Sequence, residues 1–332
     1  DPLWSRGLGD VYKRQVMVIE DENAAKSKKL GMFCVLAASV IWGTTGTAAT
    51  YAPNVSPLAI GAAAMGVGGL LQAFLAWRQI NNDRMLLRSH WFFVLLGAVS
   101  VTIYPLAFYS SMHLAGVTVG TVVTIGSAPL LSALIERLFD RRPLTKRWVV
   151  GASLGLLGTV LLCMAESTGH LPSTVNSSVM ENMLGIGLGL LAGITYALYS
   201  WTAHKLMQQG AASSSAMGTT FGIGGLLLMP VLLFTGGNLM DSWSNAAVGI
   251  YMALIPMFLG YFLFGLGLAR IRASTATTLS LIEPVVAAIL AVIIVGERLP
   301  LSGWVGVALV VACLAVLTSP SSKDETQTKA PI

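Results

Sequence analysis

Charged side chains are scarce in this sequence: Asp, Glu, Lys and Arg together make up 11% of its 332 residues. Apolar residues account for 55%, and the mean hydropathy is +0.73. A soluble domain could not cover its surface with so few charges, so the composition excludes an ordinary soluble protein. The net charge of +5 does not indicate a nucleic-acid partner, because the basic residues lie in loops between apolar runs.

Cysteine and catalytic motifs are scarce too. The three cysteines lie inside apolar runs and form no CxxC or Cys/His cluster, so we interpret them as small buried apolar residues. The sequence lacks GxSxG, HExxH and Walker A patterns. An enzyme or an ATP-driven pump is therefore disfavoured, and we expect no catalytic residue, no cofactor and no metal.

Apolar runs long enough to cross about 30 Å of hydrocarbon recur along the chain. The ten predicted spans cover residues 30–50, 57–77, 91–110, 115–137, 147–165, 184–206, 213–234, 246–269, 273–295 and 302–319. The sequence therefore predicts an all-α integral membrane protein with almost no room for a soluble domain.

Three segments lie outside the spans. Residues 1–29 form an N-terminal tail, in which residues 1–16 hold no apolar run and are interpreted as foreign to the native chain. Residues 166–183 form a polar linker expected on the outside, and residues 320–332 form a polar tail expected to be disordered in the cytoplasm.

The positions of the basic residues predict the orientation. With the N-terminus inside, sixteen Lys and Arg residues from Lys26 onward fall in inside segments, and only Arg298 falls outside. The opposite orientation would reverse this ratio, so the positive-inside rule favours ten spans with both termini in the cytoplasm.

The two halves of the chain repeat one pattern. Residues 30–165 and 184–319 hold five spans each. Matches in the same order include Gly31 with Gly185, Trp42 with Tyr196 and Pro129 with Pro284. Because five is odd, the second copy must cross the membrane in the opposite sense. The sequence thus predicts two inverted five-helix repeats, a plan typical of secondary transporters with a site between the halves.

A proline falls inside the matching span of each half, at Pro129 and at Pro284. Proline has no N–H, so each is predicted to break its helix and, for Pro284, to leave the Ser280 carbonyl free. Only the second copy has an acid beside its proline, Glu283. The alternative is that both prolines only shape their helices.

Glu283 is the only acid that these spans place deep in the membrane. A charge at that depth costs about 2.5–3.5 kcal/mol on insertion scales, so the carboxyl should favour its neutral form. Three roles stay open: a structural hydrogen bond to a neighbouring helix, proton or cation coupling, and direct contact with a substrate. Coupling would make protons a partner.

The aromatic residues fall into two groups. Those near span ends fit an interfacial belt and are Trp77, Trp91, Trp148, Trp243 and Trp304. The deeper ones are Trp42, Tyr104, Tyr109, Tyr196, Tyr199 and Tyr261. Deep tyrosines need hydrogen-bond partners, so they either line a cavity or pack in the protein interior.

His113, near the outer end of the third span, is a candidate for gating or proton relay; the alternative is an interfacial histidine with a hydrogen bond. The candidate cavity residues are therefore Trp42, Tyr104, His113, Tyr196, Tyr199, Tyr261 and Glu283.

Two motifs suggest a family. They are Leu281-Ile282-Glu283-Pro284-Val285-Val286-Ala287-Ala288-Ile289-Leu290, with Gly296-Glu297-Arg298-Leu299 after it, and Ile41-Trp42-Gly43-Thr44. The chain resembles the EamA-like family of the drug/metabolite transporter superfamily. The resemblance implies a central cavity that opens alternately to each side, and export of amino acids, other small metabolites or toxic compounds. Members often carry an arginine about seven residues after a proline like Pro57, and Ala64 stands there instead.

We therefore predict a secondary active transporter in a bacterial inner membrane. It would export small amphipathic metabolites, such as amino acids, by alternating access, as a monomer or homodimer in the lipid bilayer. An uncoupled facilitator or an uptake carrier is the alternative within transport. A membrane receptor or sensor is the alternative outside it, although the sequence has no soluble signalling domain.

Overall fold

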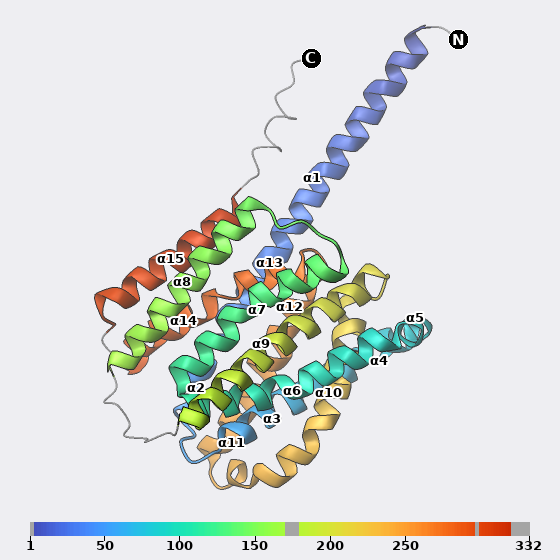
Figure 1. Ribbon diagram of the computed structural model, residues 1–332. Coiled ribbons are helices and arrows are strands. Elements are labelled where there is room, and N and C mark those ends of the chain that lie inside the picture. Colours follow the sequence, from blue (N-terminus) through green and yellow to red (C-terminus); the bar gives the residue numbers. More distant parts are fainter. Residues whose placement is uncertain (1–2, 170–178, 296–298, 320–332) are drawn as a thin grey trace.

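The computed structural model describes residues 3–169, 179–295 and 299–319 and is helical nearly throughout (Figure 1). The α-helices are α1 (Leu3–Trp42), α2 (Thr45–Ala49), α3 (Pro57–Leu75), α4 (Trp77–Asn82), α5 (Arg84–Ser89), α6 (Trp91–Ala115), α7 (Val117–Phe139), α8 (Lys146–Gly169), α9 (Val179–Gln208), α10 (Ser213–Thr235), α11 (Trp243–Met252), α12 (Tyr261–Leu268), α13 (Ala273–Leu279), α14 (Ile282–Leu290) and α15 (Leu301–Thr318). One 3₁₀ turn, η1 (Gly237–Met240), and two π-helical stretches, η2 (Ala253–Gly260) and η3 (Ala291–Val295), complete the described elements.

Nine helices of the described part are long and apolar enough to span a membrane. The prediction of an all-α multi-pass membrane protein is confirmed. Helix α8 coincides with the fifth predicted span but is not one of these nine, so the number ten stays a prediction. The predicted C-terminal tail and residues 170–178 of the predicted linker lie outside the described residues, whereas residues 166–169 and 179–183 of that linker belong to α8 and α9.

Helix ends follow from local chemistry. The Ser56 hydroxyl accepts the Ala59 amide N–H at 3.2 Å, and Pro57 at the first helical position needs no acceptor, so α3 begins there. Gly116, with φ of +87°, joins α6 directly to α7 through a backbone conformation that favours glycine. This tight turn makes α6 and α7 antiparallel neighbours.

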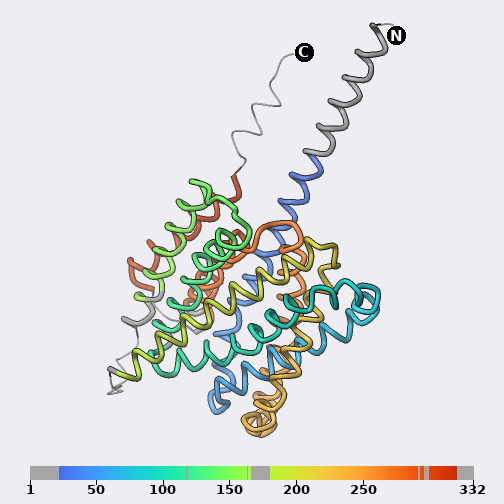
Figure 2. Tube along the Cα trace, turned by 45° about the vertical axis from the view of Figure 1, so that its right-hand side comes forward, coloured from blue at the N-terminus to red at the C-terminus, as the bar shows by residue number. Residues whose placement is uncertain are grey.

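Helices at equivalent places in the two halves pack on each other: α3 against α10, and α8 against α15. Figures 1 and 2 both show α8 and α15 side by side along one edge of the bundle. A methyl group on Gly158 would lie 2.7 Å from the Gly306 carbonyl oxygen, and one on Gly306 would lie 2.7 Å from the Gly158 carbonyl oxygen. This reciprocal backbone contact is the packing expected of two repeats related by a pseudo-two-fold axis.

Basic residues in short helices, at helix ends and in the connections between helices gather at one end of the bundle, which we call the basic end. They are Arg78, Arg84, Arg88, Arg141, Arg142, Lys146, Lys205, Arg270 and Arg272. The opposite end holds α2, η1 and the start of α11 (Figure 1).

The two matching prolines have different effects. Helix α7 runs unbroken through Pro129, so the predicted break there is wrong: neighbouring turns keep their hydrogen bonds, and α7 packs along α9. In the second half, α13 ends at Leu279 and α14 begins at Ile282, just before Pro284. The Ser280 carbonyl was predicted to be free, but it accepts the Glu283 amide N–H at 3.0 Å, because the chain tightens into a turn at the break.

Candidate functional site

A narrow cavity lies between helices of the two halves. Its lining residues are Trp42, Thr45, Gly61, Ala64, Met65, Tyr104, Pro105, Phe108, Tyr109, Tyr196, Met257, Tyr261 and Glu283. The cavity measures about 50 Å³, room for a few water molecules and less than an amino acid needs. The site is therefore nearly closed in this structure.

Five predicted site residues line this cavity together: Trp42, Tyr104, Tyr196, Tyr261 and Glu283. They come from α1, α6, α9, α12 and α14, so both halves contribute. The fold thus collects at one place side chains that are up to 241 positions apart in the sequence.

Glu283 is half-buried and carries the one carboxyl group among the described residues that line the cavity. It stands in the first turn of α14, directly after the break at Ser280 and Leu281. Among the described residues, none forms a hydrogen bond or ion pair with its carboxyl group. The carboxyl is therefore available to a proton or to a ligand.

Trp42 is held by the π-helical stretch η2. Its indole N–H donates to the Pro256 carbonyl at 2.9 Å, and its ring centroid lies 4.8 Å from that of Tyr261. A π-helical turn offsets the backbone and frees carbonyls that an α-helix would use. In this way η2 fixes one wall of the cavity.

Hydroxyl groups tie the tyrosines to the break in the ninth span. Tyr196 donates to the Ser280 hydroxyl at 2.9 Å, three residues before Glu283. Tyr199 shares a hydrogen bond of 3.0 Å with Tyr261 and is fully buried, one layer behind the cavity wall. The tyrosine rings and the break between α13 and α14 therefore form one connected layer of polar and aromatic groups.

His113 is not brought to this cavity. It is exposed in the last turn of α6 and is absent from the lining residues, so a role in gating or relay stays a prediction.

Several lining residues lay outside the predicted set. Phe108 is one of them: it lies four positions after Tyr104 on α6, and the two rings stack with centroids 5.9 Å apart. The spacing of four residues puts both rings on one helix face, which is the signal that could have identified Phe108. Tyr109 was visible only as another deep tyrosine. Ala64, which stands where the family resemblance implied an arginine, lines the cavity. Among the described residues that line the cavity there is no Lys, Arg or His.

A second hollow, which we call the outer groove, lies at the end opposite the basic end. It has a volume of about 520 Å³ and is lined by Thr44, Thr47, Ala48, Tyr51, Ser244, Ala247, Val248, Tyr251, Leu290 and Ile294. Thr44 and Tyr251 share a hydrogen bond of 2.6 Å in its wall, and the next residue, Thr45, lines the narrow cavity. The groove and the cavity are thus neighbours.

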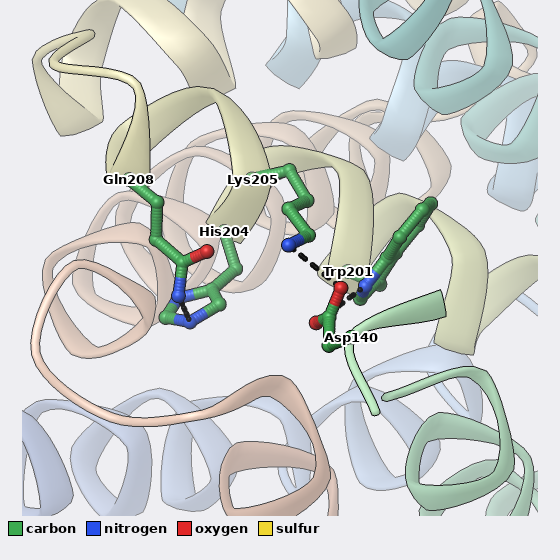
Figure 3. Close-up of polar contacts among 5 residues, drawn as sticks. All are labelled: Asp140, Trp201, His204, Lys205 and Gln208. Atoms are coloured by element: carbon green, nitrogen blue, oxygen red, sulfur yellow. Dashed lines mark hydrogen bonds and ion pairs between the residues drawn. The ribbon is translucent and has the colours of Figure 1, made fainter. Parts of the chain in front are cut away.

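At the basic end, α7 presents two acids one helical turn apart. The Asp140 carboxylate lies 2.6 Å from the Lys205 ammonium and accepts the Trp201 indole N–H at 3.1 Å, as Figure 3 shows. Glu136 accepts the Ser274 amide N–H at 3.0 Å and the Ser274 hydroxyl at 2.6 Å. Glu136, next to last in the fourth predicted span, is only 4% exposed, so the basic end also holds a buried acid, while the depth of Glu283 in the membrane stays a prediction.

Next to these acids, His204 and Gln208 pair on α9 (Figure 3). One ring nitrogen of His204 lies 2.5 Å from the Leu268 carbonyl, and the other lies 2.8 Å from the Gln208 amide. With the Leu268 carbonyl as acceptor, the first nitrogen carries the proton, and the second can accept from Gln208. These bonds join the end of α9 to α12.

Four of the five tryptophans assigned to an interfacial belt are exposed and one is buried, and the belt itself stays a prediction. Trp77, Trp91, Trp243 and Trp304 are exposed. Trp148 is buried, and its indole N–H donates to the Thr278 hydroxyl at 3.1 Å. Thr278 lies 130 positions away in the sequence, so the location of Trp148 near a span end could not reveal that its ring is buried.

The fold and sequence match known proteins. A solved crystal structure at 19% identity covers 90% of this chain and 99% of that chain with a TM-score of 0.70, which shows a shared fold. The uncharacterized transporter YwfM of Bacillus subtilis is 33% identical over 295 residues, 88% of this chain and 95% of that protein. The threonine/homoserine exporter RhtA of Escherichia coli K12 is 28% identical over 249 residues, 75% of each chain.

The model of the EamA-like transporter family matches residues 29–164 and again residues 183–319. Two matches to one family model in one chain account for the repeated pattern of spans. The chain therefore belongs to the EamA-like transporter family and is a multi-pass membrane transporter.

Proposed function

We propose that this transporter exports small amphipathic metabolites, amino acids and related compounds first among them, across the bacterial inner membrane. The observation that supports this most directly is the cavity between the halves, with its single carboxyl group among aromatic rings. The likeness to a threonine/homoserine exporter supports amino acids as the first class to test.

The chemistry of the lining fits an amphipathic solute. Trp42, Tyr104, Phe108 and Tyr261 offer ring faces for apolar parts, and a cationic group can bind over such faces. The Glu283 carboxylate can pair with an ammonium group. Because no basic side chain is among the described lining residues, a bare anion would find no counter-charge from them.

The proposed mechanism is alternating access, in which elements of the two repeats rock about the cavity. Glu283 would bind a proton when the cavity opens to one side and release it when the cavity opens to the other. A group with no fixed hydrogen bond can alternate between proton and substrate without breaking a structural contact. This coupling is the hypothesis that most needs a test.

The test uses the purified full chain in liposomes with radiolabelled threonine, homoserine and a panel of further amino acids and amines. A pH gradient is imposed, and efflux is measured for the parent and for Glu283→Gln. The amide keeps the shape of the side chain but cannot exchange a proton. We expect the parent to respond to the gradient and Glu283→Gln to lose that response.

Asp241→Asn serves as the matched control, since Asp241 is exposed and lies in a connection away from the cavity. It should keep the response to the gradient. If Glu283→Gln transports with an unchanged response, proton coupling through Glu283 is wrong. Exchange that ignores the gradient even in the parent would favour an uncoupled facilitator.

A further inference from the structure

The two acids at the end of α7 join the two halves of the protein. Glu136 reaches Ser274 at the start of α13, and Asp140 reaches Trp201 and Lys205 near the end of α9. Helix α7 lies in the first matched segment, whereas α9 and α13 lie in the second. Two side chains one helical turn apart therefore hold two helices of the other half at the basic end; Figure 3 shows the contacts of Asp140 with Trp201 and Lys205.

These contacts are shielded from water. The Asp140 side chain is 8% exposed, and the Lys205 side chain is 21% exposed. The Trp201 ring packs between Phe93 and Phe139, with ring centroids 5.5 and 5.3 Å away. An ion pair in such surroundings is little weakened by salt, and loss of one partner leaves the other buried without a counter-charge.

A second ion pair, between Glu22 and Lys26, shows the contrast. Its nitrogen and oxygen atoms lie 2.8 Å apart, but the side chains are 63% and 68% exposed and belong to one helix. An exposed pair within one helix contributes little and joins no separate elements. The Glu22–Lys26 pair therefore serves as a control, because it is also an acid–base pair but is exposed and does not join two helices.

The same places in the other half have no charge. The alignment of Pro129 with Pro284 sets Glu136 on Ala291 and Asp140 on Val295. The alignment of Trp42 with Tyr196 sets Thr47 on Trp201 and Tyr51 on Lys205. Thr47 and Tyr51 line the outer groove. The positions that carry charged contacts at the basic end thus correspond to uncharged residues at the opposite end, where Thr47 and Tyr51 line an open groove.

We propose that Glu136 and Asp140, with their partners Ser274, Trp201 and Lys205, form the gate that closes the cavity toward the basic end. This gate must part whenever the cavity opens to that side, and it is shut in this structure. The inference rests on the proposed alternating-access function. The uncharged counterpart explains why the opposite end is the more open one here.

The experiment measures access to the cavity without any need to know the substrate. Ala64, which lines the cavity, is replaced by cysteine in the full chain after Cys34, Cys163 and Cys313 are replaced by alanine. A membrane-impermeant maleimide is then applied to inside-out and to right-side-out vesicles. In the parent, we expect labelling mainly from the face opposite the basic end.

Asp140→Asn should raise the labelling rate from the basic face about tenfold and lower the rate from the opposite face. Trp201→Phe removes only one hydrogen bond and should give a smaller change in the same direction, about threefold. Lys26→Met, which breaks the exposed pair, should change neither rate. Each variant is compared after a single symmetric peak in size-exclusion chromatography confirms folding.

Unchanged labelling in both Asp140→Asn and Trp201→Phe would overturn the gate. An equal change in Lys26→Met would also overturn it, because the effect would then be one of charge alone. The proposed function fails separately: if the labelling shifts but no amino acid or amine is transported, the gate stands and the substrate class is wrong. If an amino acid or amine is transported but the labelling does not shift, the proposed function stands and the gate is wrong.

Discussion

At the basic end of the bundle, helices of the two halves are joined by the buried Asp140–Lys205 ion pair and by the Glu136 carboxyl group, which accepts two hydrogen bonds from Ser274. At the opposite end, the equivalent positions are Thr47 and Tyr51 beside an open groove. Two repeats with one backbone plan therefore give two ends with different chemistry. Under the proposed alternating access, either end of such a fold would close in turn, and we propose that these few side chains decide which end is shut.

The largest effect is expected from Lys205→Met. The Asp140 side chain is only 8% exposed, and this change leaves its carboxylate without a counter-charge. The loss should lower the free energy of unfolding by about 3 kcal/mol. Thermal unfolding in detergent measures the loss. The double variant with Asp140→Asn should recover part of that loss, because no charge is then left unpaired; two additive losses would contradict the coupling.

Glu136→Ala should come next, with a loss of about 2 kcal/mol. The change leaves the Ser274 amide and hydroxyl at the start of α13 without their acceptor. Thr47→Ala, at the opposite end, should cost less than about 0.5 kcal/mol, since Thr47 lines an open groove. Equal shifts in melting temperature for the two variants would show that the ends do not differ in strength.

Trp148→Phe should cost about 1 kcal/mol, since it removes the hydrogen bond to Thr278 and keeps most of the buried ring. Trp304→Phe is the matched control, because Trp304 is exposed and starts the equivalent helix α15. The two melting curves should separate. If Trp304→Phe is the more damaging change, the contrast between the two tryptophans is wrong.

The smallest effect is expected at the outer groove. Tyr251→Phe removes the hydrogen bond to Thr44 and should lower stability by about 0.5 kcal/mol. It should raise labelling of a cysteine at position 64 from the groove side about twofold, because that bond lies between groove and cavity. A fall in labelling would show that the bond holds the groove open.

The sequence predicted the cavity better than it predicted the gate. Trp42, Tyr196 and Glu283 stood out because deep polar and aromatic groups are rare in apolar spans, and all three line the cavity. Glu136 and Trp148 lie near span ends, where such residues are common. Their partners, Ser274 and Thr278, are 138 and 130 positions away. No local pattern reports a contact of that kind.

The sequence by itself determined the membrane character, the helical class and the family, because composition and the length of apolar runs answer to the bilayer, and family motifs are local. Only the tertiary structure decided that Pro129 leaves its helix intact, that Tyr199 lies behind the cavity and that Glu136 is buried. Each of these depends on which distant backbone lies opposite, and packing between helices sets that choice.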